Sequence, residues 1–310
     1  MRSPVNTQAA SIMLVLCLLW GVQQVAIKVT LPDVSSVLQV SIRSGVAAVL
    51  VWLVAKLVFK ERWQHRALLA AGTVVGVLFA AEFLFVAEGL NRTTASHMSV
   101  FLYTAPIWAA VGLHLKLPEE RLSRRQWVGI GIAFLGIATA FIVPTIGEGS
   151  ASLTPEMLLG DLFALAAGAA WGLTTVAVRV SKLSEAPATQ TLFYQLTISF
   201  VLLTVVTLLT GQLHFVSTPI AWLSLSFQSV VIAFGSYLVW FWLLRKYLAA
   251  RLGVLTLLTP IFGVLAGVLL LGDSLTPGFI AGSVLVLAGL LIVNVKGRTP
   301  DSGRHAGDGK

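Results

Sequence analysis

The sequence predicts an all-α integral membrane protein with ten transmembrane helices, arranged as two inverted five-helix repeats with both termini in the cytoplasm. The chain is 57% hydrophobic and only 11% charged, whereas soluble domains carry about 25% charged residues. Its apolar runs are long enough to cross a bilayer. The second half also repeats motifs of the first in the same order, which indicates an internal duplication.

Apolar runs between charged, glycine or proline residues define ten segments, most of them near the ~20 residues that a bilayer requires. The segments cover residues 9–29, 35–58, 67–89, 94–115, 126–146, 157–179, 188–211, 219–244, 248–271 and 276–295. We therefore expect a first repeat at residues 1–146, an external linker at 147–156 and a second, inverted repeat at 157–295. Residues 296–310 are polar and glycine-rich, which indicates a disordered cytoplasmic tail.

The basic residues predict the orientation of these helices. With a cytoplasmic N-terminus, all but three of the 21 Lys and Arg residues lie at cytoplasmic helix ends or in cytoplasmic loops, and the exceptions are Lys28, Arg43 and Arg92. This is the positive-inside pattern of membrane proteins, so the net charge of +8 does not indicate a nucleic-acid partner. The single cysteine, Cys17, excludes an intrachain disulfide.

The duplication is read from three sets of motifs. WGVQQVAIK, starting at Trp20, matches WGLTTVAVR, starting at Trp171, and TAPIW around Pro106 matches LTPIF around Pro260. In the helix that ends each repeat, Gly129 and Gly136 match Gly282 and Gly289. A unit of five helices is odd, so its second copy enters the membrane from the opposite side. Inverted repeats recur in transporters, with the substrate site near the bilayer midplane.

These motifs resemble those of the drug/metabolite transporter superfamily, in its ten-helix EamA family. An acidic residue followed by a glycine-rich helix, EERLSRRQWVGIGIAFLGI and GDSLTPGFIAGSVLVLAGL, completes the resemblance, which covers residues 9–295. The resemblance implies a secondary-active transporter, mostly of the exporting kind, for amino acids (aromatic ones included) and related small metabolites. It also implies a central cavity lined by the first, third, fourth, sixth, eighth and ninth helices.

Candidate substrate-binding residues are aromatic or polar side chains expected near that cavity. They are Trp20, Gln23, Gln24, Glu82, Phe83, Tyr103, Trp171, Thr174, Thr175, Tyr237 and Trp240. Binding pockets combine apolar and aromatic walls with a few placed polar groups. Packing between the repeats is the alternative for the tryptophans, and interhelical hydrogen bonding is the alternative for the Gln and Thr pairs.

Three titratable or charged residues and two prolines complete the candidate site. Glu82 lies inside the expected third helix, and an ionisable group at membrane depth indicates function. It either carries a proton or a substrate ammonium, or forms a structural ion pair with Arg43. His97 is a second proton-binding candidate, with a buried interface histidine as the alternative. Pro106 and Pro260 interrupt helical hydrogen bonding and mark either hinges or static kinks.

Other function classes are less well supported by the sequence. It contains no HExxH, GxSxG or Walker-type motif and no Cys/His cluster, which argues against a membrane enzyme, a metal site or a cofactor. A channel requires like residues from several subunits, and the duplication favours a carrier. The expected partners are a small-molecule substrate and the lipid bilayer of the cell (inner or plasma) membrane, with a monomer sufficient for function. Drugs, nucleosides or other metabolites are alternative substrates.

Overall fold

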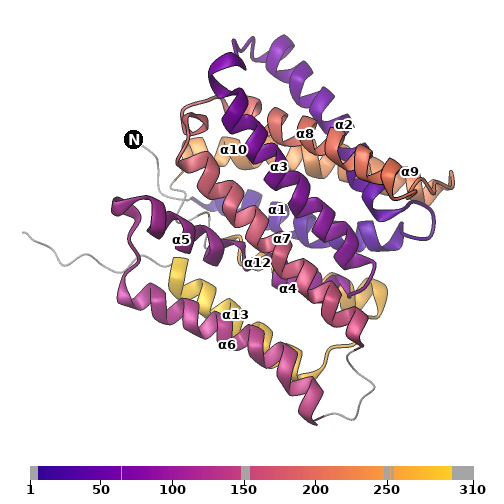
Figure 1. The fold of residues 1–310 in the computed structure, drawn as a ribbon, viewed down its shortest axis with the longest axis vertical. Coiled ribbons are helices and arrows are strands. Elements are labelled where there is room, and N and C mark those ends of the chain that lie inside the picture. The colour runs from indigo at the N-terminus through magenta and orange to yellow at the C-terminus, as the bar shows by residue number, and fades with distance from the viewer. Residues whose placement is uncertain (1–5, 64, 148–153, 248–251, 253–254, 295–310) are drawn as a thin grey trace, which may run out of the picture.

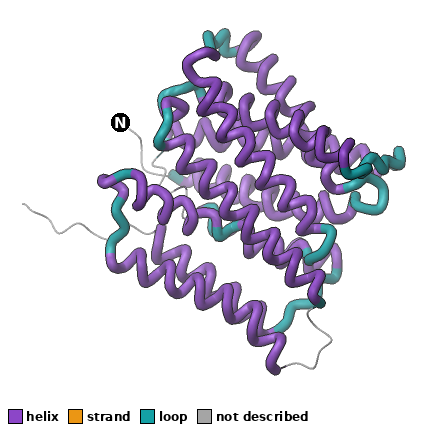
Figure 2. Tube along the Cα trace, in the orientation of Figure 1, coloured by secondary structure: helices purple, strands orange, loops and turns teal. Residues whose placement is uncertain are grey.

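The computed structural model describes residues 6–63, 65–147, 154–247, 252 and 255–294. Within these residues the regular secondary structure is helical, and Val34 and Phe215 form an isolated β-bridge (Figure 2). The expected tail at 296–310 and most of the linker at 147–156 lie outside the described residues.

The helices follow the chain in two series, which we call the first half (residues 7–147) and the second half (residues 154–294). The first half contains α1 (Thr7–Val29), α2 (Ser36–Leu53), the π-helix η1 (Val54–Val58), α3 (His65–Leu90), α4 (Ala95–Leu102), α5 (Ala105–Lys116), the 3-10 helix η2 (Pro118–Glu120) and α6 (Arg124–Gly147). The second half contains α7 (Pro155–Arg179), η3 (Lys182–Ser184), α8 (Ala188–Leu209), α9 (Pro219–Ser226), the π-helix η4 (Phe227–Ser236), α10 (Tyr237–Lys246), α12 (Leu258–Ala266), the π-helix η5 (Gly267–Leu271) and α13 (Pro277–Asn294).

The described helices overlap all ten expected segments. Seven helical stretches are long and apolar enough to cross a membrane: Thr7–Val29, Ser36–Val58, Arg66–Leu90, Ala95–Lys116, Pro155–Arg179, Ala188–Leu209 and Pro219–Trp240. Two shorter apolar stretches, Leu258–Leu271 and Pro277–Val293, follow in the second half. The chain is therefore an all-helical, multi-pass membrane protein.

Side-chain caps fix the starts of several helices. Asn6 accepts a hydrogen bond from the backbone N–H of Ala9 at 2.9 Å and so begins α1. Thr94, Thr154 and Thr218 cap α4, α7 and α9 in the same way, each at 3.1 Å. Such caps satisfy N–H groups that would otherwise have no partner at a helix start, which matters most where lipid replaces water.

The expected fourth segment is not one continuous helix. It divides into α4 and α5 at Tyr103 and Thr104, and Pro106 lies in the first turn of α5. A proline is tolerated there because the first N–H groups of a helix have no helical acceptor. The Thr104 hydroxyl donates to the carbonyl of Phe101 at 2.7 Å and accepts from Trp108 Nε1 at 3.2 Å, which holds the break together. Pro260 likewise lies in the first turn of α12.

Contacts between the two halves form a regular pattern (Figure 1). Helix α6 packs along α13, α2 along α8, and α4 against α12. Several other contacts come in pairs that interchange when the halves are exchanged. Helix α1 packs on α12 as α7 packs on α5, α3 packs on α7 as η4 packs on α1, and α3 packs on α8 as η4 packs on α2.

Glycines make the same close approach in both halves. A Cβ on Gly21 would lie 2.7 Å from the backbone nitrogen of Gly263, and a Cβ on Gly172 would lie 2.8 Å from that of Ala109. The register that aligns the two Pro-Ile motifs also aligns Ala109 with Gly263. The backbone contact of α1 with α12 is thus repeated by α7 with α5, at equivalent positions.

The contact of α6 with α13 is reciprocal. A Cβ on Gly129 would lie 2.8 Å from the carbonyl oxygen of Gly289, and a Cβ on Gly136 would lie 2.6 Å from that of Gly282. In the alignment of the halves, Gly129 corresponds to Gly282 and Gly136 to Gly289. Exchanging the halves therefore converts one contact into the other. Small residues let membrane helices approach this closely.

The substitution Gly136→Leu is expected to destabilise the protein by about 3 kcal/mol, because overpacking against backbone atoms cannot be relieved by side-chain rotation. Gly131→Leu on the same helix is the matched control, since Gly131 is exposed and a Cβ there meets no atom within 4 Å. Thermal unfolding of both variants in detergent measures the difference. Equal melting temperatures would contradict the close α6–α13 contact.

Candidate functional site

Arg43 is a fully buried cation in α2. Its side chain is 0% exposed, and among the described residues none of its three guanidinium nitrogens has a hydrogen-bond partner. Its guanidinium carbon lies 3.9 Å from the ring centroid of Phe83, a cation–π contact that offsets part of the lost hydration. An unpaired buried charge is costly, so this position requires an explanation beyond packing.

Glu82 and Tyr237 lie beside this cation. Glu82, on α3, is 5% exposed, and its Oε2 atom has no hydrogen-bond partner among the described residues. Both residues interact electrostatically with Arg43. Although all three are described, no ion pair joins Glu82 to Arg43, and the Tyr237 hydroxyl lies close to Arg43 without completing a hydrogen bond of ordinary geometry. The structural ion pair considered from the sequence is therefore not formed directly.

Aromatic rings surround these polar groups. The Phe79 ring lies 4.8 Å from that of Phe83 and 6.5 Å from that of Tyr237. Tyr103, at the break between α4 and α5, interacts electrostatically with Glu82 and Tyr237, and its ring lies 5.1 Å from that of Trp171. The group formed by Arg43, Phe79, Glu82, Phe83, Tyr103 and Tyr237 is called the central cluster below.

The π-helix η4 leads directly into Tyr237. A π-helical turn changes the angular position of the residues that follow it and is frequent at functional sites. At its end, the Ser236 hydroxyl accepts a hydrogen bond of 2.9 Å from Trp20 Nε1. The Trp20 ring also meets that of Trp240 at 5.7 Å. The two tryptophans thus extend the central cluster toward α1 and α10.

The remaining polar candidates are placed differently. Gln23 and Gln24 are both buried in α1, and Gln24 Oε1 has no partner among the described residues. On α7, Thr174 is buried and Thr175 is exposed, as expected for neighbours about 100° apart on a helix. Both threonine hydroxyls bond carbonyls of their own helix. The structure does not bring Thr175 into the central cluster.

Two residues of the site escaped the sequence reasoning. Phe79 could have been found, because it lies four residues before Phe83 and so shares its helix face. Asp161 is the second of these residues, and it is 2% exposed and pairs with His97. Nothing in the local sequence connects these two residues, since they are on different halves of the protein.

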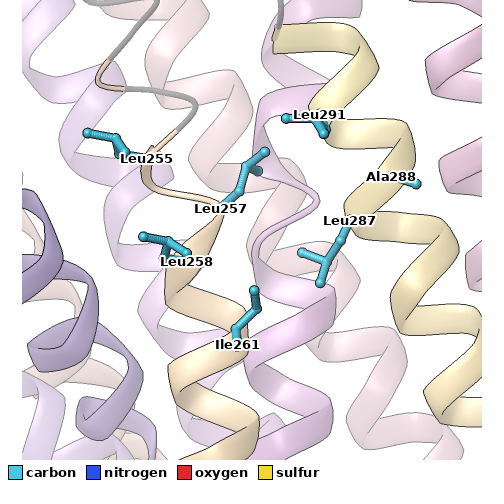
Figure 3. A pocket seen from close by; sticks show the side chains of 7 residues that line it. All are labelled: Leu255, Leu257, Leu258, Ile261, Leu287, Ala288 and Leu291. Atoms are coloured by element: carbon cyan, nitrogen blue, oxygen red, sulfur yellow. The ribbon is translucent and has the colours of Figure 1, made fainter. Parts of the chain in front are cut away.

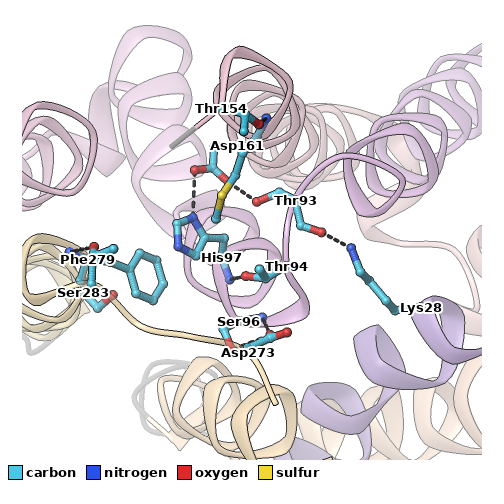
Figure 4. A network of polar contacts seen from close by, with 12 residues as sticks. Lys28, Thr93, Thr94, Ser96, His97, Thr154, Asp161, Asp273, Phe279 and Ser283 are labelled. Atoms are coloured by element: carbon cyan, nitrogen blue, oxygen red, sulfur yellow. Dashed lines mark hydrogen bonds and ion pairs between the residues drawn. The ribbon is translucent and has the colours of Figure 1, made fainter. Parts of the chain in front are cut away.

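His97 belongs to a polar network at the end of the bundle where α1 ends and α4 begins (Figure 4). Its Nδ1 atom lies 2.8 Å from Asp161 Oδ2, and both side chains are buried. The hydroxyl of Thr93 donates to the other oxygen of Asp161. The imidazole stacks on Phe279 of α13 with ring centroids 3.9 Å apart, and its Nε2 atom has no partner in the described part of the chain.

The same network extends to Asp273, which follows η5, and to Lys28 at the end of α1. Asp273, after η5, accepts hydrogen bonds from the backbone nitrogen and the hydroxyl of Ser96, at 2.9 and 2.8 Å. Lys28, in the last turn of α1, donates to the carbonyls of Leu90, at 2.8 Å, and Thr93. These residues, together with His97, Asp161 and Phe279, are called the His97 network below. It ties α1 and α4 of the first half to α7 and α13 of the second.

A groove of about 380 Å³ lies between α12 and α13 (Figure 3). Its lining is aliphatic: Leu255, Leu257, Leu258, Ile261, Leu287, Ala288 and Leu291. It contains none of the candidate site residues and offers no polar group to a ligand. The described residues also contain no group of His, Cys, Asp and Glu that could hold a metal ion.

The comparisons with known proteins assign the fold and the family. A profile described as "EamA-like transporter family" matches residues 7–142 and 158–295, so the chain belongs to the EamA-like transporter family. A solved crystal structure with 18% sequence identity shares the fold, with a TM-score of 0.61, and the match covers 93% of this chain and 96% of the other. The protein is thus a transporter-family, multi-pass protein of the plasma membrane.

Relatives in bacteria carry names of the same kind. A "Probable amino-acid metabolite efflux pump" of Salmonella typhimurium is 26% identical over 290 residues, which are 90% of this chain and 92% of the relative. A protein of the same name in Escherichia coli is 24% identical, covering 90% of this chain and 92% of that one. An uncharacterised transporter of Bacillus subtilis is also 24% identical, covering 89% and 92%. The family and these names indicate a transporter rather than an enzyme.

The substitution Asp161→Ala is expected to destabilise the protein by about 2 kcal/mol, because it leaves the buried His97 Nδ1 and Thr93 hydroxyl without their acceptor. Glu156→Ala, at an exposed position in the first turn of the same helix, is the control. Thermal unfolding in detergent distinguishes the two variants. If both melt like the unmodified protein, the His97–Asp161 pair contributes nothing to stability.

Proposed function

We propose that the protein is a secondary-active transporter that exports amino acids and related small metabolites by alternating access. In this proposal ten transmembrane helices form two inverted five-helix repeats, residues 1–146 and 157–295, with both termini in the cytoplasm. Ten helices with both repeats make a complete carrier, so the monomer is the functional unit. The carrying observation is the central cluster, which unites two charged groups of the first half with aromatic rings from both halves.

The exchange pattern of the helix contacts supports the inverted repeats. The largest contacts between the halves correspond to themselves or have a counterpart, and the family profile matches the two halves separately, at residues 7–142 and 158–295. A molecule with this symmetry has two nearly equivalent arrangements, because each half can adopt the conformation of the other. Inverted-repeat carriers alternate between such arrangements around a fixed site.

Charged pairs at the two ends of the bundle support alternating access. Lys28 interacts electrostatically with Asp273 at one end, and Arg179 forms an ion pair of 3.2 Å with Glu120 at the other. The repeat alignment matches Lys28 with Arg179 and, with a one-residue slip, Asp273 with Glu120. Each end therefore places a cation and a carboxylate from equivalent positions near each other, although only Arg179 and Glu120 form an ion pair among the described residues. In this proposal, opening an end moves its two groups apart. Pro106 and Pro260, beside the breaks of their helices, are the proposed hinges.

The proposed substrate site is the central cluster with its tryptophan neighbours. It offers opposite charges and several aromatic rings, which suits amphipathic metabolites such as amino acids, aromatic ones included. The names of the Salmonella and Escherichia relatives point the same way. Glu82 is the proposed proton-binding group or ammonium partner, with His97 as a second titratable candidate.

Reconstituted proteoliposomes test this function. Vesicles preloaded with a mixed amino acid pool are offered labelled aromatic, aliphatic and charged amino acids, with and without a pH gradient. Saturable counterflow of an amino acid supports the proposal. Flux of drugs or nucleosides alone would keep the carrier and reject the substrate class, whereas the absence of saturable flux of every compound would reject the carrier itself.

Glu82→Gln is expected to abolish the acceleration of transport by a pH gradient while leaving folding intact, because a glutamine cannot bind and release a proton. Glu185→Gln, at an exposed position after α7, is the control and is expected to retain the effect. The measurement is the initial uptake rate across a range of imposed pH differences. An unchanged pH dependence in Glu82→Gln would contradict proton binding at Glu82.

Asp273→Asn and Glu120→Gln are expected to shift the equilibrium between the inward-open and outward-open conformations in opposite directions. Each substitution weakens the charged pair at one end of the bundle. The shift is smaller for Glu120, whose ion pair with Arg179 is exposed and contributes at most about 1 kcal/mol. A cysteine introduced at Thr174 in a Cys17→Ser background reports access to impermeant thiol reagents from each side. If both variants increase thiol access from the same side of the membrane, the proposal that the two pairs close opposite ends is contradicted.

A further inference from the structure

We propose that Arg43 and Glu82 form a zwitterion-binding subsite, in which Arg43 binds the carboxylate of the substrate and ionised Glu82 binds its ammonium group. The transported class is then free α-amino acids, and it excludes amines, amides and simple carboxylic acids. This inference rests on the proposed transport function and identifies the groups that select its substrate.

The guanidinium donors of Arg43 complete no hydrogen bond of ordinary geometry with the described residues. A guanidinium has five N–H donors in a fixed planar arrangement that matches the two oxygens of a carboxylate. In the described residues, no acceptor engages the three nitrogens that carry them, although the side chain is completely buried. Phe83 stabilises the cation by a contact at 3.9 Å and accepts no conventional hydrogen bond. Apart from the nearby Tyr237 hydroxyl, which completes no hydrogen bond of ordinary geometry, the guanidinium donors of Arg43 remain available to a carboxylate.

The carboxyl group of Glu82 is also incompletely partnered. Its Oε2 atom is buried and has no partner among the described residues, and the whole residue is 5% exposed. It is close enough to Arg43 to interact electrostatically but forms no ion pair with it. A buried cation and a buried carboxyl group are thus held near each other, with one carboxyl oxygen of Glu82 left without a partner among the described residues.

An α-amino acid complements this arrangement because its carboxylate and ammonium groups are attached to the same carbon. When it bridges the two side chains, each buried charge gains a partner and the net charge of the site does not change. An amine would leave Arg43 unpaired, and a simple carboxylic acid would leave Glu82 unpaired. A buried charge without a partner is strongly unfavourable, and a site built for polar groups rejects analogues that lack one of them.

The aromatic members of the central cluster receive the rest of the substrate. Tyr103 interacts electrostatically with Glu82, and its ring packs edge-on against Trp171. Tyr237 is close to both charges and packs against Phe79. A side chain attached to the zwitterion therefore meets aromatic surfaces, which accommodate apolar groups of several shapes. The charged pair selects the amino acid class, and the rings set the preference within it.

Competition in proteoliposomes tests the subsite in the full chain. The probes are labelled L-phenylalanine and L-leucine, each competed by the unlabelled amino acid, its amide, its decarboxylated amine and its deaminated acid. The amide and amine lack the carboxylate, and the deaminated acid lacks the ammonium. Each analogue is expected to compete at least about 100-fold more weakly than the amino acid. Competition as strong as that of the amino acid would overturn the inference while leaving the carrier established.

Transport of nucleosides or drugs without any amino acid would also overturn the zwitterion subsite. In that case the saturable flux itself would still support a carrier. If no compound shows saturable flux, the proposed function fails together with the inference. The two failures are therefore distinguishable in one set of vesicles.

Variants assign the two roles. Arg43→Gln is expected to lower kcat/KM for the amino acid at least about 100-fold and to remove the preference for the amino acid over its amine. Glu82→Gln is expected to remove the preference over the deaminated acid while keeping that over the amine. Arg125→Gln, which removes an exposed arginine at the start of α6, is the control and should preserve both ratios.

These ratios separate substrate recognition from a purely structural role, because misfolding lowers transport of every compound alike. If Arg43→Gln does not fold, Arg43→Lys serves in its place. It keeps the charge and loses the planar bidentate geometry, so its KM for the amino acid should rise more than its kcat falls. Unchanged ratios in the folded Arg43 and Glu82 variants would overturn the assignment.

Discussion

The burial of the Arg43 cation within a bundle of apolar helices is the constraint around which the centre of this protein is arranged. At membrane depth a charged side chain faces the bundle interior or a partner rather than lipid. Helices α2, α3 and α10 therefore converge so that Phe83 covers the guanidinium and Glu82 and Tyr237 supply negative or polar groups nearby. The cluster remains incompletely satisfied, and this incompleteness suits a site that must bind and release a polar ligand.

The bundle can hold such a site because its two halves pack by the same contacts. Glycines at equivalent positions allow α1 to approach α12, and α7 to approach α5, at backbone distance. The pair of α6 and α13 is joined by reciprocal glycines and gives both halves a common, rigid support. In the proposed alternating-access cycle, equivalent contacts in the two exchanged conformations would keep the free-energy difference between them small.

The symmetry is not complete, and the exception lies in the His97 network. The pair of His97 and Asp161 has no counterpart, because Ala10 occupies the position of the first half that corresponds to Asp161. One end of the bundle therefore has a buried polar connection, whereas the other has the exposed ion pair of Arg179 and Glu120. Buried polar connections are lost less readily than exposed ones, so under the proposed alternating access the two ends would differ in how easily they open.

The sequence by itself determined the membrane class, the apolar segments and the EamA resemblance. All of these depend on composition or on neighbours along the chain, as does the ion pair of Glu88 with Arg92 at 2.6 Å, four residues apart. Only the tertiary structure decided that Arg43 and Glu82 stay unpaired and that His97 pairs with Asp161. These outcomes depend on how distant helices pack, and packing distances follow from side-chain volumes across the interface, which no local pattern encodes.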